Sequence, residues 1–175
     1  MTYPSISALT PRAARLWYSL LVAWAFCSML AAVFYFQQHL GLEPCYLCIT
    51  QRFFVVAIGA VAAVGLLFGP SSRLHKPLHG AIALLAAVGS AFSLKQLWLQ
   101  SLPADQVPVC GPPVDYLFEA FPTGEIISML IQGDGNCAEI KWQLLGLSMP
   151  GWVLLMFVAV LTTTLWRLWA ARKAA

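Results

Sequence analysis

The sequence predicts an all-α membrane protein, a four-transmembrane-helix bundle with one long loop outside the membrane. Of its 175 residues, 60% are hydrophobic and only 10% are charged, whereas soluble proteins average about 45–50% and about 25%. Four stretches with few charges are each long enough to cross a bilayer, which takes about 20 residues as a helix. Basic and acidic residues also fall into separate connections. This composition excludes an ordinary soluble enzyme, a disordered chain and a nucleic-acid-binding protein.

Four membrane helices are expected over residues 16–36, 48–68, 78–99 and 152–169. Backbone groups in lipid must bond within their own segment, so each span must be helical. The first stretch is longer than the core of a cleaved signal peptide, so we expect a membrane span there. Gln51 and Gln96 either join two helices or line a ligand site. Residues 1–175 are expected to form a single integral membrane domain.

The charged residues orient these helices. Seven of the ten basic residues precede the first stretch, separate the second from the third, or lie at the exit of the fourth and after it: Arg12, Arg15, Arg73, Lys76, Arg167, Arg172 and Lys173. All seven acidic residues lie in two other loops, about 37–47 and 100–148: Glu43, Asp105, Asp115, Glu119, Glu125, Asp134 and Glu139. Because basic segments stay in the cytoplasm, we expect both termini there and these two loops outside.

Cys45 and Cys48 lie at the outer end of the second predicted helix, separated by two residues. That spacing permits a disulfide, and a helix N-terminus stabilises a thiolate. Arg52 follows Cys48 by four residues, so its charge lies on the same helix face. These residues predict a redox-active dithiol, and the alternatives are a static disulfide or a zinc site. Ile49 stands where c-type haem attachment requires histidine.

Cys110 and Cys137 lie in the long outer loop, on the side of the membrane where disulfides persist. Glycine and proline flank both residues, so we expect two accessible and mobile sulfurs that exchange disulfides. A purely structural staple is the alternative. Cys27 lies inside the first predicted helix, and we expect it to fill the core.

The loop between Cys110 and Cys137 predicts a short interfacial helix. Apolar and acidic side chains fall on two different faces at helical spacing: Leu117, Phe118 and Phe121 on one, Asp115 and Glu119 on the other. Apolar residues continue after a break at Pro122. We expect this helix to lie on the membrane surface, and a small packed core within the loop is the alternative.

The chain resembles the bacterial disulfide bond formation protein B (DsbB) family of inner-membrane quinone reductases. The resemblance covers nearly the whole chain, including the four helices, both cysteine pairs and Arg52. It extends through a specific string of residues: Cys137-Ala138-Glu139, Trp142, Leu145-Gly146, Ser148-Met149-Pro150 and Trp152.

The resemblance implies a membrane thiol–disulfide oxidoreductase that re-oxidises a periplasmic, DsbA-like thioredoxin-fold oxidase and reduces a membrane quinone, either ubiquinone or menaquinone. It implies four catalytic cysteines, paired as Cys45–Cys48 and Cys110–Cys137. The partner would attack Cys110, the released Cys137 would attack Cys45, and Cys48 with Arg52 would meet the quinone. It implies a multi-pass protein of the bacterial inner membrane with periplasmic redox loops. We expect no metal site.

One region departs from the family. A histidine near the end of the third helix in the best-known member is replaced here, around Gln100 and Ser101, so its role is not carried over. Two other functions compete with this interpretation. One is a thiol enzyme like the vitamin K epoxide reductases, in which the Cys-x-x-Cys motif follows the loop pair. The other is a non-enzymatic, disulfide-stapled membrane scaffold or assembly factor.

Overall fold

A computed structural model describes residues 10–69 and 74–173. The helices in chain order are α1 (Pro11–Leu30), the π-helix η2 (Ala31–His39), α2 (Tyr46–Phe68), α3 (His75–Gln100), α4 (Val114–Ala120), α5 (Thr123–Gln132), the 3-10 turn η3 (Gly135–Cys137) and α6 (Met149–Lys173). A small antiparallel hairpin, β1 (Gln143–Leu144) and β2 (Leu147–Ser148), leads directly into α6. Arg73, one of the basic residues from which the membrane orientation was predicted, lies outside the described residues.

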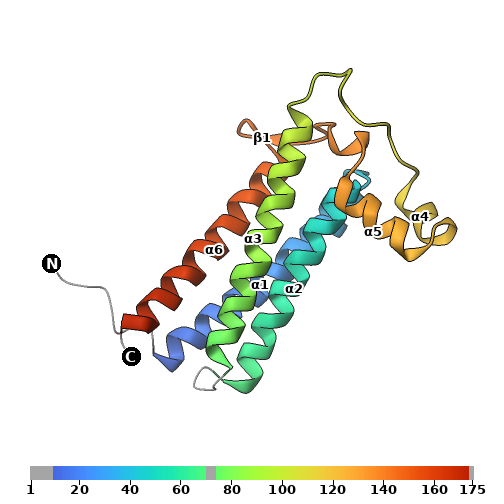
Figure 1. Cartoon of the computed structure of the whole chain (residues 1–175). Helices are drawn as coiled ribbons and strands as arrows, with labels where there is room; N and C mark the ends of the chain where they lie inside the picture. Colours follow the sequence, from blue (N-terminus) through green and yellow to red (C-terminus); the bar gives the residue numbers. More distant parts are fainter. Residues whose placement is uncertain (1–9, 70–73, 174–175) are drawn as a thin grey trace.

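Four long helices run side by side, and each is long and apolar enough to cross a membrane (Figure 1). The predicted four-helix membrane bundle is therefore confirmed. α1 begins and α6 ends at one end of the bundle. The hairpin, α4 and α5 gather at the opposite end, called the loop end below.

α2, α3 and α6 each contain the predicted apolar stretch and extend beyond it, and the first stretch, 16–36, is covered by α1 together with η2. α1 begins at Pro11 because the Thr10 side chain caps it, accepting a hydrogen bond from the Ala13 amide at 3.2 Å. At its other end the chain continues as the π-helix to His39. Apolar composition marks only the part of a helix that meets lipid, whereas caps decide where the helix starts.

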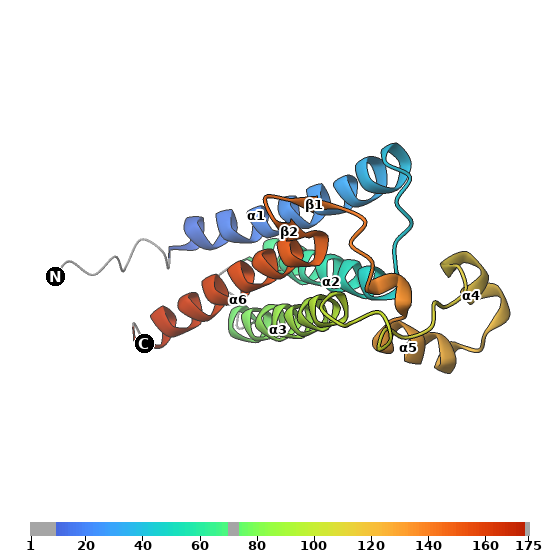
Figure 2. The ribbon, with the colours of Figure 1, turned by 90° about the horizontal axis from the view of Figure 1, so that it is seen from above.

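The four long helices pack in an open order. α3 packs against α6, α2 against α3, and α1 against α2. α1 and α6 make little direct contact with each other, and Figure 2 shows them separated at the loop end. Space is therefore left between these two helices beside the start of α2.

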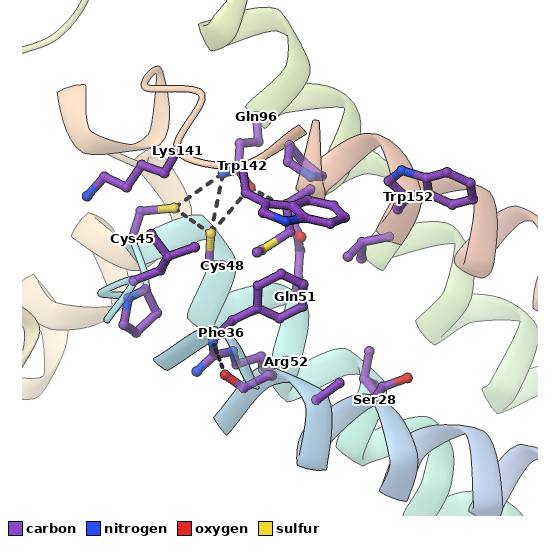
Figure 3. Close-up of a pocket in the computed structure, with 18 of the residues that line it drawn as sticks. Ser28, Phe36, Cys45, Cys48, Gln51, Arg52, Gln96, Lys141, Trp142 and Trp152 are labelled. Atoms are coloured by element: carbon purple, nitrogen blue, oxygen red, sulfur yellow. Dashed lines mark hydrogen bonds between the residues drawn. The ribbon is translucent and has the colours of Figure 1, made fainter. Parts of the chain in front are cut away.

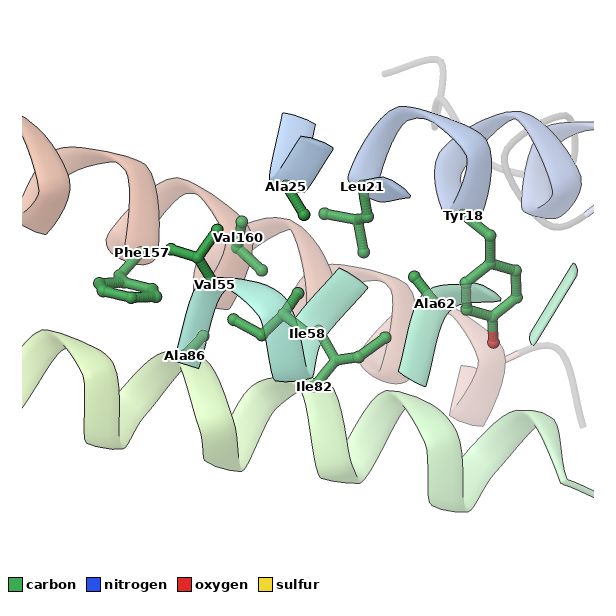
Figure 4. Packing of buried hydrophobic residues seen from close by; sticks show 10 residues of the cluster. All are labelled: Tyr18, Leu21, Ala25, Val55, Ile58, Ala62, Ile82, Ala86, Phe157 and Val160. Carbon is green, nitrogen blue, oxygen red and sulfur yellow. The ribbon is translucent and has the colours of Figure 1, made fainter. Parts of the chain in front are cut away.

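A cluster of buried residues from all four long helices forms the core of the bundle (Figure 4). Its members are Tyr18, Leu21, Ala25, Val55, Ile58, Ala62, Ile82, Ala86, Phe157 and Val160. Small residues allow the helices to approach closely, as is usual in membranes. The ring of the fully buried Phe157 on α6 lies directly over Gly89 on α3.

We expect Gly89→Ala to destabilise the protein. A β-carbon at Gly89 would lie 2.6 Å from the Phe157 ring, and overpacking of this kind costs about 1–3 kcal/mol. The measurement is the midpoint of thermal unfolding in detergent. Gly80→Ala is the matched control, because Gly80 lies on the same helix with open space at its β-carbon position. Equal midpoints for the two variants would contradict this packing.

The predicted loop helix is two helices, α4 and α5, and they separate at Pro122. Leu117 and Ile126 are buried against Leu47 and Leu99 from the ends of α2 and α3. These side chains therefore pack the loop helices against the bundle, in a core shared by the loop and the ends of α2 and α3. Contact of these helices with the membrane surface stays a prediction.

Two hydrogen bonds attach the end of α5 to the bundle. The Thr50 hydroxyl on α2 donates to the Leu130 carbonyl at 2.9 Å. The Lys95 ammonium on α3 donates to the Ile131 carbonyl, also at 2.9 Å. Carbonyls in the last turn of a helix have no partner within the helix, and a cation is favourable there. The loop is thereby held over the start of α2 and the end of α3, which carry the site.

Candidate redox site

Cys45 and Cys48 lie together at the start of α2. Cys45 is the N-cap residue with an extended backbone (φ −75°, ψ 169°), and Cys48 is in the first helical turn. Their sulfurs are 2.7 Å apart. An extended cap followed by one helical turn brings the two side chains of a Cys-x-x-Cys motif to the same side, so the pair can form or break a disulfide with little movement of the backbone.

Gln96 on α3 faces both sulfurs (Figure 3). Its amide nitrogen donates to Cys45 Sγ at 3.3 Å and to Cys48 Sγ at 3.4 Å. The Gln51 amide nitrogen in turn donates to Gln96 Oε1 at 2.8 Å. These glutamines therefore join α2 to α3, which is one of the two interpretations that the sequence left open. They also line a cavity, and the other interpretation, a ligand site, stays a prediction.

Arg52 lies one turn after Cys48, as predicted, but its hydrogen bonds are directed to the first helix. The guanidinium donates to Gln37 Oε1 at 2.6 Å and to the Ala32 carbonyl at 3.4 Å. Both acceptors belong to the π-helix η2, and such helices are frequent at functional sites. Arg52 thus contributes a charge to the wall of the site and also attaches α2 to η2.

A cavity of about 370 Å³ lies beside the Cys45–Cys48 pair. Most of its wall is apolar, with side chains from α1, η2, α6 and the chain before β1: Met29, Phe36, Trp142, Trp152, Val153 and Met156. Phe36 and Trp142 meet edge to face across it, with ring centroids 5.2 Å apart. The polar groups that reach it from α2 and α3 include Cys48, Gln51, Arg52 and Gln96.

This cavity has the size and character of a binding site for an apolar ring. Small-molecule sites usually measure about 300–1,000 Å³ and combine apolar walls with a few convergent polar groups. Gln100, which lies where the sequence lacks the histidine noted above, also lines the cavity. Its side-chain oxygen accepts a hydrogen bond from the Ser148 hydroxyl at 2.7 Å. Gln100 therefore attaches the hairpin to α3 at the edge of the cavity.

The two loop cysteines differ sharply in exposure. Cys110 is exposed, whereas Cys137 is fully buried. The expectation of two accessible sulfurs is wrong for Cys137. The turn η3 folds this residue under the loop, into the same buried cluster as Cys45 and Leu47. Both pairings stay predictions, because the five cysteines are free thiols in this structure.

Cys137 lies next to Cys45. Hydrogen bonding of the Cys45 thiol with Cys137 and Cys48, together with burial, raises its pKa far above the ordinary value. Cys45 is therefore held as a neutral thiol between two other sulfurs. Such a residue suits the central position of an exchange, in which it forms a bond to either neighbour.

Asp134 connects the two loop segments that carry Cys110 and Cys137. One carboxylate oxygen accepts a hydrogen bond from the Cys137 thiol at 3.3 Å. The other accepts from the Gly111 amide at 3.0 Å and from Asn136 at 2.6 Å. The carboxylate is almost completely buried. In the sequence Asp134 is only one of the acidic residues of the outer loops, and no spacing pattern distinguishes it from the exposed ones.

Cys110 lies at the edge of a second, larger hollow of about 970 Å³. Its wall also contains Cys45, Tyr46 and Pro112, and the Tyr46 hydroxyl donates to the Pro112 carbonyl at 2.6 Å. The hollow thus places the exposed Cys110 and the buried Cys45 in one wall, and Cys45 also lines the apolar cavity. Among residues 10–69 and 74–173, no group of three or more His, Cys, Asp or Glu side chains is arranged to hold a metal ion.

Comparison with known proteins adds a family to this geometry. A family model described as disulfide bond formation protein DsbB matches residues 14–167. The chain is 45% identical over 154 residues to disulfide bond formation protein B of Chromobacterium violaceum, which covers 88% of this chain and 93% of that protein. It is 41% identical over 156 residues to the protein of the same name from Saccharophagus degradans, with 88% and 92% covered.

Proposed function

Because the chain belongs to the disulfide bond formation protein B (DsbB) family, we propose that it re-oxidises a periplasmic DsbA-like dithiol oxidase and passes the electrons to a membrane quinone. It is a disulfide-forming oxidoreductase with four candidate membrane spans. One observation carries the finer proposal. The Cys45–Cys48 pair lies on the wall of an apolar cavity, and the buried Cys137 packs in the same cluster as Cys45.

The proposed sequence begins at the exposed thiol. A thiolate of the reduced partner attacks Cys110 of a Cys110–Cys137 disulfide, which forms a mixed disulfide and releases Cys137. Cys137 then attacks Cys45 of a Cys45–Cys48 disulfide, forming Cys45–Cys137 and releasing Cys48 as a thiolate. The partner's second thiol displaces Cys110, and Cys110 displaces Cys45 from Cys137. The partner leaves oxidised, and Cys45 and Cys48 hold the two electrons.

The cavity residues fit a quinone as the electron acceptor. The apolar wall suits a lipid-soluble ring, and Gln51, Arg52 and Gln96 offer hydrogen-bond donors near Cys48. A quinone held there, ubiquinone or menaquinone, would supply an acceptor for two electrons and two protons, which would allow Cys45 and Cys48 to return to a disulfide. In this proposal the chain's own residues orient the ring and hold the Cys48 sulfur beside it.

We propose that the protein lies in the bacterial inner membrane with the loop end in the periplasm and both termini in the cytoplasm. The distribution of basic residues supports this orientation. Among the described residues, Arg12, Arg15 and Lys76 lie at the end of the bundle opposite the loop end, as do Arg167 and Arg172. Basic segments of this kind remain cytoplasmic.

The proposal is tested with the purified protein, a reduced thioredoxin-fold oxidase and either quinone. We expect quinone absorbance to fall in proportion to the disulfide formed in the partner. A chain that exchanges disulfides with the partner but reduces neither quinone would contradict the proposed acceptor.

We expect Arg52→Ala to raise the KM for quinone by about tenfold or more, since a hydrogen bond to a charged group contributes about 1.5–3 kcal/mol. Steady-state rates at varied quinone concentration measure this. Disulfide exchange with the partner, followed without quinone, should change little. Arg52→Lys separates charge from geometry, because lysine keeps the charge but not the two-pronged contact with η2. An unchanged dependence on quinone in Arg52→Ala would rule out this role.

A further inference from the structure

Gln96 is the polar side chain that bridges both sulfurs of the Cys45–Cys48 pair. Its amide nitrogen lies 3.3 Å from Cys45 Sγ and 3.4 Å from Cys48 Sγ, and the residue is only 3% exposed. A glutamine amide nitrogen carries two N–H donors, enough for both sulfurs. Figure 3 shows the amide directed at the pair from the opposite helix.

Gln51 sets the direction in which this amide points. Its own amide nitrogen donates to Gln96 Oε1 at 2.8 Å. The oxygen of Gln96 also accepts from the Cys48 thiol at 3.9 Å, a longer contact than the 3.4 Å from the nitrogen to the same sulfur. The nitrogen is therefore the nearer group to the sulfurs. Gln51 is 4% exposed, so both amides are held in a buried interface between α2 and α3. The donors are in place before any charge develops.

Arg52 carries a positive charge on the same helix face as Cys48, but its hydrogen bonds do not go to that sulfur. The Arg52 guanidinium donates hydrogen bonds to Gln37 and to the Ala32 carbonyl, both in η2. Arg52 therefore acts on Cys48 through its field, whereas Gln96 contacts the sulfur itself.

We propose that Gln96 is a catalytic residue whose side-chain N–H stabilises the thiolate that Cys48 becomes during disulfide exchange. This inference rests on the proposed function. When the Cys137 thiolate attacks Cys45, the Cys45–Cys137 bond forms and the Cys45–Cys48 bond breaks. The electron pair of the broken bond goes to Cys48 Sγ. Net oxidation state is unchanged, no proton is transferred, and the new negative charge lies on the atom that Gln96 contacts.

The physical basis is that a preorganised donor is most effective where charge develops in a buried site. A hydrogen bond to a charged group is about twice as strong as one between neutral groups. Gln96 should therefore favour Cys48 as the leaving sulfur and keep it as a reactive thiolate. Loss of one such bond corresponds to a change of about tenfold or more in the thiolate population.

The test measures the reactivity of Cys48 in the fully reduced protein. The purified chain is treated with iodoacetamide at pH 7, and the rate of alkylation of each cysteine is read by mass spectrometry of its peptide. Only the thiolate reacts. Gln96→Leu removes the donor. Because this leaves the Gln51 amide without its buried acceptor, the double variant Gln51→Leu/Gln96→Leu is also made, and replacing both partners by apolar groups preserves packing best.

Ser93→Ala is the matched control. Ser93 is fully buried on the same helix, and its hydroxyl bonds to the Gly89 carbonyl of that helix at 3.1 Å. The exposed Cys110 serves as the internal reference in every sample. Thermal unfolding midpoints in detergent identify variants that remain folded.

We expect alkylation of Cys48 to slow by about tenfold in Gln96→Leu and in the double variant, with Cys110 unchanged, and Ser93→Ala to match the parent. A folded double variant in which Cys48 reacts as fast as in the parent would overturn the proposal. The assay needs neither partner nor quinone. A protein that fails to reduce quinone would therefore refute the proposed function while this measurement still decides the role of Gln96.

Discussion

Replacing Cys48 with serine is expected to abolish quinone reduction while the protein remains folded. Cys48 lines the apolar cavity together with Gln51, Arg52 and Gln96, and in the proposed sequence it is the sulfur released as a thiolate beside the quinone. A serine hydroxyl neither forms a disulfide with Cys45 nor carries electrons as a thiolate does. Quinone absorbance in the presence of reduced partner measures the effect, with ubiquinone and menaquinone analogues tried in turn.

Cys27→Ser is the matched control for this experiment. Cys27 is exposed on α1, outside the cavity wall, and its replacement should leave turnover as in the parent. A Cys48→Ser variant that still reduced quinone at a measurable rate would show that electrons leave the chain at another residue. Equal loss in both variants would indicate a general effect on folding instead of chemistry.

Cys110→Ser is expected to abolish oxidation of the partner but to leave the α2 pair active. Cys110 is exposed at the edge of the larger hollow, whereas Cys137 and Cys45 are buried. Cys110 is therefore the most accessible of these three sulfurs to a partner thiolate. Disulfide formation in the partner, followed by thiol trapping on gels, measures the first effect. Re-oxidation of the chemically reduced Cys45–Cys48 pair by quinone measures the second.

Normal oxidation of the partner by Cys110→Ser would refute the assigned point of attack. The same trapping assay addresses the scaffold alternative in the unaltered chain. In a relay, adding reduced partner without quinone converts the protein's disulfides into thiols, because electrons enter and cannot leave. In a static scaffold the disulfides persist. Four unchanged disulfide-bonded cysteines after this treatment would favour the scaffold.

Much of the architecture could be predicted because a membrane restricts the choices. A chain in lipid must satisfy its own backbone, so apolar stretches of this length had to be helices. The break between α4 and α5 could be placed because proline removes a backbone donor and restricts the residue before it. Cysteine spacing identified the Cys45–Cys48 pair, since two intervening residues at a helix start bring the side chains together.

The faces of those helices could not be predicted in the same way. In a soluble helix the polar side marks the exterior, but a membrane helix is apolar toward lipid and toward its neighbours alike. Cys27 is the clear case. We expected it to fill the core, and this was wrong, because the packed face of α1 carries Tyr18, Leu21 and Ala25, and Cys27 is exposed.

The sequence by itself determined four membrane helices, an oriented distribution of charge and a dithiol at the start of one helix. Only the tertiary structure decided that Cys137 is buried beside Cys45, that Gln96 faces both sulfurs, and that an apolar cavity separates α1 from α6. The physical reason is distance along the chain. Gln96 and Cys137 lie far from Cys45 in sequence, and they meet it only through close packing of α2 with α3 and the folding of the loop over both.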